Sequence, residues 1–251
     1  MSKKSKGISI IIPVLNEAGN IQPLTDRLTA VLKSMKMKYE LIFIDDNSTD
    51  ATKALITALA SKTNGTIKFY TKVGQRGKAN SILEGITYAI YDTVCMIDAD
   101  LQYAPENIAP MYMQMIETNT DVVITNRKTN ETSVLRKILS GGFNLVFTRM
   151  MFGINYDTQS GQKLFRAEVF EHVKINPSPW GFDLEFIVSS LLKGYSISSY
   201  DIDFTERLDG EAKVHVLKTS VELAKESIKL RLKINKKNLK TNYMKNLELV
   251  R

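Results

Sequence analysis

The sequence predicts an α/β protein: a single domain with a mostly parallel central sheet, helices on both faces, and a helical, basic C-terminal tail. Three observations support this. Apolar, β-branched runs occupy residues 7–14, which end in Pro13 and Val14, and residues 40–44, which Asp45 and Asp46 follow. Residues 20–35, between them, repeat their apolar side chains at helical spacing. The same alternation continues to about residue 125, and strands that alternate with amphipathic helices build parallel sheets.

The elements follow in order along the chain. The runs GISIIIPV (residues 7–14) and ELIFI (residues 40–44) are continuously apolar, as strands buried on both faces are. Together with the helix at 20–35 they form a βαβ unit. We expect further helices at 50–61, at 77–90 and after Pro105, and further strands at 66–70, 93–97 and 121–125.

Composition limits the class of protein. A chain of 251 residues with 43% apolar residues can bury the core of one domain. No apolar run approaches the roughly 18 residues that a membrane-spanning helix needs, and the N-terminus lacks a secretory signal pattern. We therefore expect a cytoplasmic protein. The single cysteine, Cys95, can form no internal disulfide and is expected to be a small buried apolar residue.

The net charge of +7 is concentrated in the tail. Residues 213–251 hold 11 Lys and Arg against 3 Asp and Glu, which leaves 23 against 24 elsewhere. Such a cluster can bind nucleic acid or an anionic membrane surface, or can simply be a solvated helix face. We divide the chain into a catalytic domain (1–213) and an amphipathic basic tail (214–251).

The tail also repeats apolar residues at helical spacing between residues 216 and 234. They are Leu217, Val221, Leu223, Ala224, Ile228, Leu230 and Ile234. We predict a peripheral anchor on the cytoplasmic membrane face and no nucleic-acid partner. The apolar stripe could instead pack on the catalytic domain or on the second subunit of a homodimer.

Residues suited to binding a ligand follow four of the five predicted strands. The carboxyl ends of parallel strands form the ligand crevice in open sheets, so these residues should gather at one edge. They are Pro13, Asn16 and Glu17 after the first strand, Asp45 and Asp46 after the second, Asp98, Asp100 and Gln102 after the strand at 93–97, and Asn126 and Arg127 after the strand at 121–125.

Asp98 and Asp100 flank Ala99 directly after an apolar strand, and the amide of Gln102 is close by. Three oxygen donors within five positions suit Mg²⁺ or Mn²⁺ that keeps water and phosphate oxygens as its other ligands. A lone Asp-x-Asp can equally form a turn or cap a helix. The position after a core strand favours the metal.

Two further loops have a functional and a structural interpretation. Asp46 can accept hydrogen bonds from ribose hydroxyls or base N–H groups. We expect Asn47, Ser48 and Asp50, in contrast, to turn the chain and cap the next helix. The basic turn at residues 74–78 could cradle an anion, although it lacks the spacings of known nucleotide-binding loops.

Taken together, these segments resemble the motifs of the family 2 glycosyltransferases. The first four are IIIPVLNE (10–17), FIDDNSTDAT (43–52), GQRGKANSILEGI (74–86) and MIDADLQ (96–102). The later ones, Arg136 with Ser140, DTQSGQKLFR (157–166), PWGFDLEF (179–186) and ERLDGEAKV (206–214), resemble the dolichyl-phosphate mannosyltransferase and dolichyl-phosphate glucosyltransferase branch. The resemblance covers residues 7–214 and implies the Rossmann-like GT-A fold.

The resemblance also implies roles for individual residues. The positions that hold the donor nucleotide are Pro13, Leu15, Glu17 and Asp46, with Lys78 and Asp98 beside them. The metal and diphosphate positions are Asp98, Asp100 and Gln102. The positions that grip the acceptor phosphate or donor pyrophosphate are Arg127, Arg136, Ser140, Arg207 and Lys213. Three departures stand out: Gln75-Arg76 in place of a Gly-rich turn, Ala212 in place of Ser, and no counterpart of the membrane-spanning segments of many relatives.

The reaction that this implies is inverting transfer of a hexose from a UDP-glucose or GDP-mannose type donor to a polyprenyl phosphate. A phosphate acceptor is already anionic near pH 7 and needs no strong base. If the acceptor is a hydroxyl in a glycan, a base is required, and Asp183 is the candidate. A nucleotidyltransferase would carry a basic loop after the first strand, where this chain has PVLNEAGN. A receiver-like module would leave Asp98 and Asp100 without a role.

Overall fold

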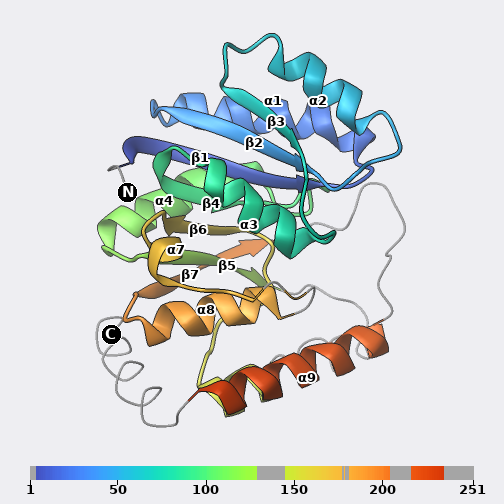
Figure 1. Cartoon of the computed structure of the whole chain (residues 1–251). Helices are drawn as coiled ribbons and strands as arrows, with labels where there is room; N and C mark the ends of the chain where they lie inside the picture. Colours follow the sequence, from blue (N-terminus) through green and yellow to red (C-terminus); the bar gives the residue numbers. More distant parts are fainter. Residues whose placement is uncertain (1–3, 129–144, 177, 179–180, 204–215, 235–251) are drawn as a thin grey trace.

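The computed structural model describes residues 4–128, 145–176, 178, 181–203 and 216–234. It confirms the expected α/β class, with a seven-stranded sheet in the order β3-β2-β1-β4-β6-β5-β7 (Figure 1). The strands are β1 (Ser5–Val14), β2 (Tyr39–Asp45), β3 (Ile67–Thr71), β4 (Tyr91–Met96), β5 (Val122–Lys128), β6 (Lys163–Arg166) and β7 (Ile197–Asp203). The helices are α1 (Ala18–Ser34), α2 (Thr52–Ala60), α3 (Lys78–Tyr88), α4 (Ile108–Glu117), α7 (Val169–His172), α8 (Phe182–Leu192) and α9 (Val216–Lys233), with the short helical turns η1 (Pro105–Asn107) and η3 (Leu145–Met150).

Strand direction decides which loops meet. β1 pairs in parallel with β2 on one side and β4 on the other, and β2 pairs in parallel with β3. β6 runs antiparallel to both of its neighbours, β4 and β5, while β7 is again parallel to β5. The carboxyl ends of six strands and the amino end of β6 therefore lie along one edge of the described sheet. The prediction of a mostly parallel sheet is confirmed.

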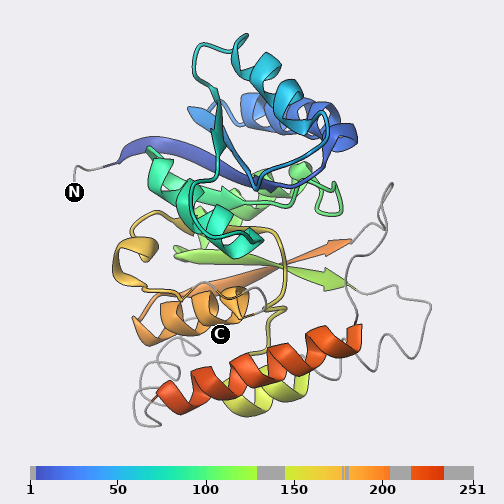
Figure 2. The ribbon, with the colours of Figure 1, turned by 45° about the vertical axis from the view of Figure 1, so that its right-hand side comes forward.

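Helices cover both faces of the sheet, as the two views show (Figures 1 and 2). Ile10 and Ile12 of β1 belong to one core, with apolar residues of α1, α2 and α4. Ile11 belongs to the other core, with residues of α3, α7 and α8. All three isoleucines are fully buried, which explains why β1 is apolar at consecutive positions from Ile10 to Ile12 rather than at alternate ones.

The expected elements up to residue 125 are present, with small shifts at their ends. The helix expected at 20–35 is α1, which begins two residues earlier, at Ala18. The side chain of Asp50 accepts a hydrogen bond from the N–H of Ala18 (3.2 Å), and Thr52 accepts one from the N–H of Glu17 (2.9 Å). Side chains at residues 50 and 52 thus bind backbone N–H groups at the start of α1. The sequence of residues 16–20 alone does not predict where the helix begins, because these partners lie more than 30 residues away.

The tail helix predicted at 216–234 is α9. Leu223, Ser227 and Leu230 are buried, and α9 lies beside η3, as both views show (Figure 2). One side of the helix therefore packs on the rest of the molecule. No helix in the described ranges is long and apolar enough to cross a membrane. The proposed boundary at 213/214 lies outside the described residues.

Candidate active site

The loops after β1 and β2 are joined by hydrogen bonds. The N–H of Asn16 donates to Ser48 Oγ (2.9 Å), and the N–H of Thr49 donates to Asn16 Oδ1 (2.8 Å). Asn16 and Asn47 adopt left-handed backbone angles, with φ of 56° and 64°, which asparagine tolerates better than most residues. Asp50 also accepts from the N–H of Thr52 (3.0 Å) at the start of α2. The structural interpretation of Asn47, Ser48 and Asp50 agrees with these contacts.

The four residues expected to hold the nucleotide lie on these two loops. Pro13 is near the end of β1, and Leu15 follows it with 42% of its surface exposed, so it can offer an apolar surface to a base. Glu17 Oε2 accepts a hydrogen bond from Asn20 Nδ2 (2.8 Å), which fixes its carboxylate at the start of α1. Asp46 follows β2 at the same edge. Their nucleotide-binding role stays a prediction.

Asp46 also shapes the loop before α3. Its Oδ2 accepts a hydrogen bond from the N–H of Gly77 (2.8 Å), and its Oδ1 lies 2.6 Å from Lys72 Nζ. Lys72 Nζ donates in addition to the carbonyl of Gly77 (3.1 Å). Gly77 has a φ of 118°, which an L side chain rarely adopts. These contacts set the position where α3 begins, and Lys78 is its first residue.

Lys78 reaches the metal candidate. Its Nζ lies 2.6 Å from Asp98 Oδ1, so the basic turn and the Asp-x-Asp sequence meet as expected for one phosphate site. Desolvation acts to lower the pKa of Lys78, but the carboxylates of Asp98 and Asp183 outweigh it and the pKa lies above its usual value. The ammonium group therefore stays charged and available to a diphosphate.

Asp98 and Asp100 stand directly beyond the end of β4. Burial raises the pKa of Asp98, and the nearby carboxylates of Asp100 and Asp183 add to this against the ammonium of Lys78. Asp100 Oδ1 accepts a hydrogen bond from the backbone N–H of Gln102 (3.2 Å), a turn in which Leu101 has a φ of 60°. This hydrogen bond involves the backbone of Gln102. The expected role of its side chain as a metal ligand stays a prediction.

These residues fit a hard divalent cation. Mg²⁺ usually binds through one or two carboxylates and completes its shell with water and substrate phosphates, and Asp98 with Asp100 matches that pattern. Burial is the main cause that raises the pKa of Asp98, and a bound cation would compensate the charge of its carboxylate there. Within the described ranges no three His, Cys, Asp or Glu side chains are grouped as a metal site.

Sequence reasoning missed two residues that surround Asp98. A Cβ atom at Gly161 would overlap the Asp98 carboxylate and lie 2.8 Å from its Cγ, so the segment before β6 passes directly over this side chain. Tyr103 is also buried against Gly161, and burial raises the pKa of its phenol to about 12, which keeps the hydroxyl protonated. Gly161 lies in the motif at residues 157–166, but that motif does not predict that the glycine contacts Asp98.

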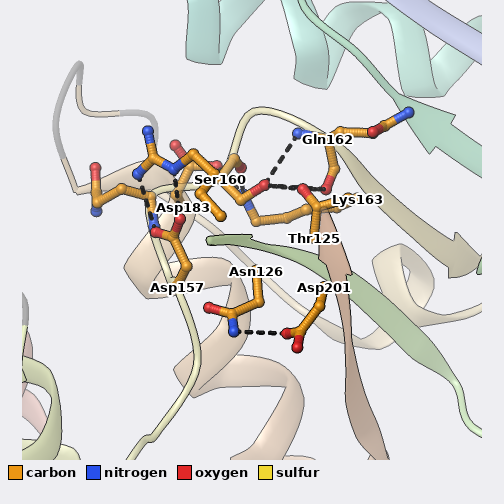
Figure 3. Close-up of polar contacts among 10 residues, drawn as sticks. Thr125, Asn126, Asp157, Ser160, Gln162, Lys163, Asp183 and Asp201 are labelled. Carbon is orange, nitrogen blue, oxygen red and sulfur yellow. Dashed lines mark hydrogen bonds and ion pairs between the residues drawn. The ribbon is translucent and has the colours of Figure 1, made fainter. Parts of the chain in front are cut away.

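Arg127, at the end of β5, forms a two-point ion pair with Asp157. Its Nε lies 2.5 Å from Asp157 Oδ2, and its second guanidinium nitrogen, Nη2, donates to Oδ1 at 3.1 Å (Figure 3). Desolvation opposes the charge, yet the carboxylates of Asp157 and Asp183 hold the pKa of Arg127 above its usual value. The guanidinium is thus fixed at the sheet edge where β1, β2, β4 and β5 end, which we call the catalytic edge. Its expected phosphate-binding role stays a prediction.

Asp183 is the second residue of α8 and pairs with Lys163, the first residue of β6. Lys163 Nζ lies 2.5 Å from Asp183 Oδ1 and also donates to the carbonyl of Ser160 (Figure 3). Lys163 is fully buried, and the sequence analysis gave it no role. The sequence signal for it is that Lys163 directly precedes the apolar pair Leu164 and Phe165. Of the phosphate-binding candidates, Arg136, Ser140, Arg207 and Lys213 lie outside the described residues.

Comparison with known proteins identifies the family. The model of glycosyl transferase family 2 matches residues 9–174, more than half of the chain. The chain belongs to glycosyltransferase family 2. This confirms the family to which the motifs pointed, and it makes the site described above the candidate active site of a glycosyltransferase.

Curated relatives within the family are named for transfer to a lipid phosphate. Undecaprenyl-phosphate 4-deoxy-4-formamido-L-arabinose transferase of Yersinia pestis is 34% identical over 149 residues, which is 59% of this chain and 45% of the relative. The enzyme of the same name from Yersinia enterocolitica is 34% identical over 148 residues, with the same coverage. The match thus spans less than half the length of these relatives.

Solved structures share the fold. Glucosyl-3-phosphoglycerate synthase of Mycobacterium tuberculosis, in complex with Mn²⁺, UDP and phosphoglyceric acid, has a TM-score of 0.68 at 18% identity, covering 91% of this chain and 78% of its own. The same enzyme with Mg²⁺ and UDP gives a TM-score of 0.68 at 18% identity, covering 91% and 79%. At this identity the likeness concerns the fold, and it confirms the expected GT-A class.

Proposed function

We propose that this chain is a metal-dependent hexosyltransferase that moves a sugar, with inversion, from a nucleotide-sugar donor of the UDP-glucose or GDP-mannose type to a polyprenyl phosphate. One observation carries the proposal. Two cations at one edge of the sheet, Lys78 and Arg127, are held by Asp98 and Asp157, and Asp98 is also half of the Asp98–Asp100 pair after β4. Two phosphate-bearing substrates repel each other, and fixed cations beside a metal-binding pair of carboxylates reduce that repulsion.

The donor would bind from the β1 side. Leu15 and Pro13 would contact the base, while Glu17 and Asp46 would accept hydrogen bonds from base or ribose donors. Lys78 would shift from Asp98 to the diphosphate oxygens, which suit an ammonium group equally well. Asp98, Asp100 and Gln102 would hold Mg²⁺ or Mn²⁺, and the bound ion would stabilise the negative charge that develops on the departing nucleoside diphosphate.

The acceptor would bind from the β5 side, at Arg127 together with Arg136, Ser140, Arg207 and Lys213. A phosphate monoester has a second pKa of about 6, so its oxygen is already a nucleophile near pH 7. The protein then needs to position the two substrates rather than remove a proton. The relatives named for undecaprenyl phosphate support this acceptor class, and the solved structures that hold Mn²⁺ or Mg²⁺ with UDP support the donor class.

The second candidate is transfer to a sugar hydroxyl in glycan synthesis. Asp183 would then have to act as base, and its position among the charged groups of the site favours some catalytic role. One of its oxygens, Oδ1, is already engaged by Lys163, which favours the phosphate acceptor over the hydroxyl.

A panel of nucleotide sugars tests the proposal directly. The purified protein is incubated with each donor and Mg²⁺ or Mn²⁺, with a short polyprenyl phosphate, with the matching polyprenol, or with no acceptor. We expect nucleoside diphosphate release that requires the phosphate and stops with EDTA. Equal release with the phosphate-free alcohol would show that the acceptor is a hydroxyl. Release that EDTA leaves unchanged would show that the reaction needs no divalent metal.

A membrane location belongs to the same proposal, at the cytoplasmic face. The outward side of α9 carries three exposed apolar residues, Val221 (54%), Ile228 (45%) and Leu232 (82%). Exposed lysines at 225, 229 and 233 stand along the same helix. Each cation near an anionic leaflet contributes about 1 kcal/mol, so this side of α9 suits a reversible contact with anionic lipid.

Vesicle sedimentation tests the location. We expect binding to anionic but not zwitterionic vesicles, weaker binding in high salt, and a large loss in Ile228→Glu. Ile116→Glu is the matched control, because Ile116 is an exposed isoleucine (51%) on a different helix, α4. If Ile228→Glu sediments as well as Ile116→Glu, α9 is not the contact. A change in mass rather than in vesicle binding would identify α9 as a subunit interface.

A further inference from the structure

The segment that leads into β6, residues 157–162, and the first residue of the strand, Lys163, lie at the catalytic edge. Because β6 is antiparallel to its neighbours, its first residue rather than its last lies at this edge. In register, Lys163 stands opposite Met96 of β4 and Ile124 of β5. Asp98 and Asn126 follow those two residues at the same edge. The lysine is therefore placed between the strand ends that carry the donor and acceptor candidates.

The surroundings of Lys163 are unusual for a charged side chain. The residue is 0% exposed, and its ammonium has two oxygen partners, Asp183 Oδ1 at 2.5 Å and the carbonyl of Ser160. Desolvation lowers the pKa of Lys163, and Asp183 opposes this. A buried ion pair is seldom more stable than apolar residues of the same size. Stability alone does not explain a lysine at this position.

The partner of Lys163 lies within the site. Asp183 is in the first turn of α8, where the helix dipole favours a negative charge. Its charge contributes to the pKa values of Asp98, Lys78 and Arg127, and its partner Lys163 stands in register with Met96, two residues before Asp98. Its side chain keeps 19% of its surface exposed while Lys163 behind it keeps none. The lysine thus reaches the carboxylate from the core, and the exposed surface of the pair belongs to the carboxylate.

The segment itself is fixed directly before the lysine, at Ser160 and Gln162. Thr125 of β5 donates its N–H to the carbonyl of Gln162 (3.2 Å), and its hydroxyl is hydrogen-bonded to Ser160 (Figure 3). Gln162, which is fully buried, donates to the carbonyl of Ala104 (3.3 Å). A lysine anchored in this way has little freedom to follow a moving partner, so it sets where Asp183 can be.

We propose that Lys163 is a positioning residue for sugar transfer, which fixes the carboxylate of Asp183 as a hydrogen-bond acceptor for hydroxyls of the transferred sugar. The inference rests on the proposed function for the reaction but not on the identity of the acceptor. A carboxylate held by one oxygen offers the other in a fixed direction, and such preorganisation assists transfer without a proton leaving the substrate.

A double-mutant cycle tests this with Lys163→Met, Asp183→Asn and both together, using whichever donor and acceptor the wild type uses. We expect Lys163→Met to lower kcat about 10- to 100-fold, as loss of a supporting partner does, and to change metal-dependent binding of the released nucleoside diphosphate less than about 3-fold. In the Asp183→Asn background, Lys163→Met should lower kcat no further. Binding is followed by calorimetry, which needs no turnover.

Lys68→Met is the matched control. Lys68 makes an ion pair of similar length with Glu40 (2.6 Å), near the amino-terminal end of β2 and away from the catalytic edge. We expect it to lower the melting temperature and leave kcat unchanged. If Lys163→Met itself does not fold, the double variant removes both charges and is compared with Asp183→Asn alone.

Two results would overturn the proposal. Losses in kcat that multiply in the double variant would show that Lys163 does not act through Asp183. A kcat per folded molecule equal to that of wild type would make the pair purely structural. A wild type that transfers no sugar to any acceptor is a different result, because it rejects the proposed function before the cycle begins.

Discussion

At the scale of single residues, the site depends on how closely Asp98 is enclosed. The residue lies under Gly161, pairs with Lys78 at 2.6 Å and has Asp100 two positions away. Burial and the carboxylate of Asp100 raise the pKa of Asp98, whereas Lys78 lowers it, so the charged form of Asp98 is favoured by a nearby cation. Small changes in this space should therefore affect metal binding before they affect folding.

We expect Gly161→Ala to lower transfer and metal affinity by about 10-fold or more, because the added methyl group occupies the space of the Asp98 carboxylate. Activity against Mn²⁺ concentration, and Mn²⁺ binding in the presence of nucleoside diphosphate, measure this. Gly19→Ala is the control, since no atom lies within 4 Å of the added methyl group. An unchanged Mn²⁺ dependence in Gly161→Ala would contradict the prediction.

Asp100→Ala should lower kcat about 100-fold or more while the melting temperature changes little. Asp100 is partly exposed, and its Oδ1 supports a single turn through the N–H of Gln102. The loss should therefore concern charge stabilisation rather than packing. Circular dichroism melting beside the transfer assay separates the two, and activity near that of the wild type would exclude Asp100 as a metal ligand.

At the scale of elements, α9 has two different sides. Leu230 contributes to the core beside α8, whereas Ile228, two residues earlier, is exposed. The sequence pattern gave both as members of one apolar stripe. Because α9 packs against the domain, Leu230 is buried and Ile228 stays exposed. The exposed residues are those that a lipid or a protein partner could contact.

Leu230→Ala should lower the free energy of unfolding by about 2 kcal/mol, because the residue is 9% exposed and its removal leaves a cavity beside the core. Ile228→Ala should change it by less than about 0.5 kcal/mol. Urea denaturation of both variants in the absence of lipid measures the difference. Equal effects would mean that α9 does not pack as described.

At the scale of the whole molecule, the two cores share one sheet. Cys95 lies in β4, near the centre of that sheet, with no exposed surface. Burial raises the pKa of its thiol, so at pH 8 the group is protonated as well as shielded, and thiolate is the reactive form. Reagents should reach it mainly when the sheet opens.

We therefore expect Cys95 in the folded protein to react with a maleimide at least about 1,000-fold more slowly than in guanidinium. Nucleoside diphosphate with Mn²⁺ should slow the reaction further, because ligands that bind the folded state oppose opening. Mass spectrometry of timed samples gives the rates. Fast labelling of the folded protein would show that β4 opens locally.

The sequence by itself determined the α/β class, the elements up to β5 and the family, because these depend on local periodicity and on short motifs in order. It also predicted that Asp98 and Asp100 lie at one edge, since parallel strands end there, and the resemblance to the family predicted Lys78 beside them. The roles of Lys163 and Gly161 could not be predicted in this way. They depend on β6 running antiparallel, which brings its first residue to the catalytic edge, and strand direction is decided by packing between distant segments. Contacts between distant segments also decide which side of α9 is buried. Periodicity predicts an apolar stripe along this helix, but tertiary packing decides which part of the stripe is covered.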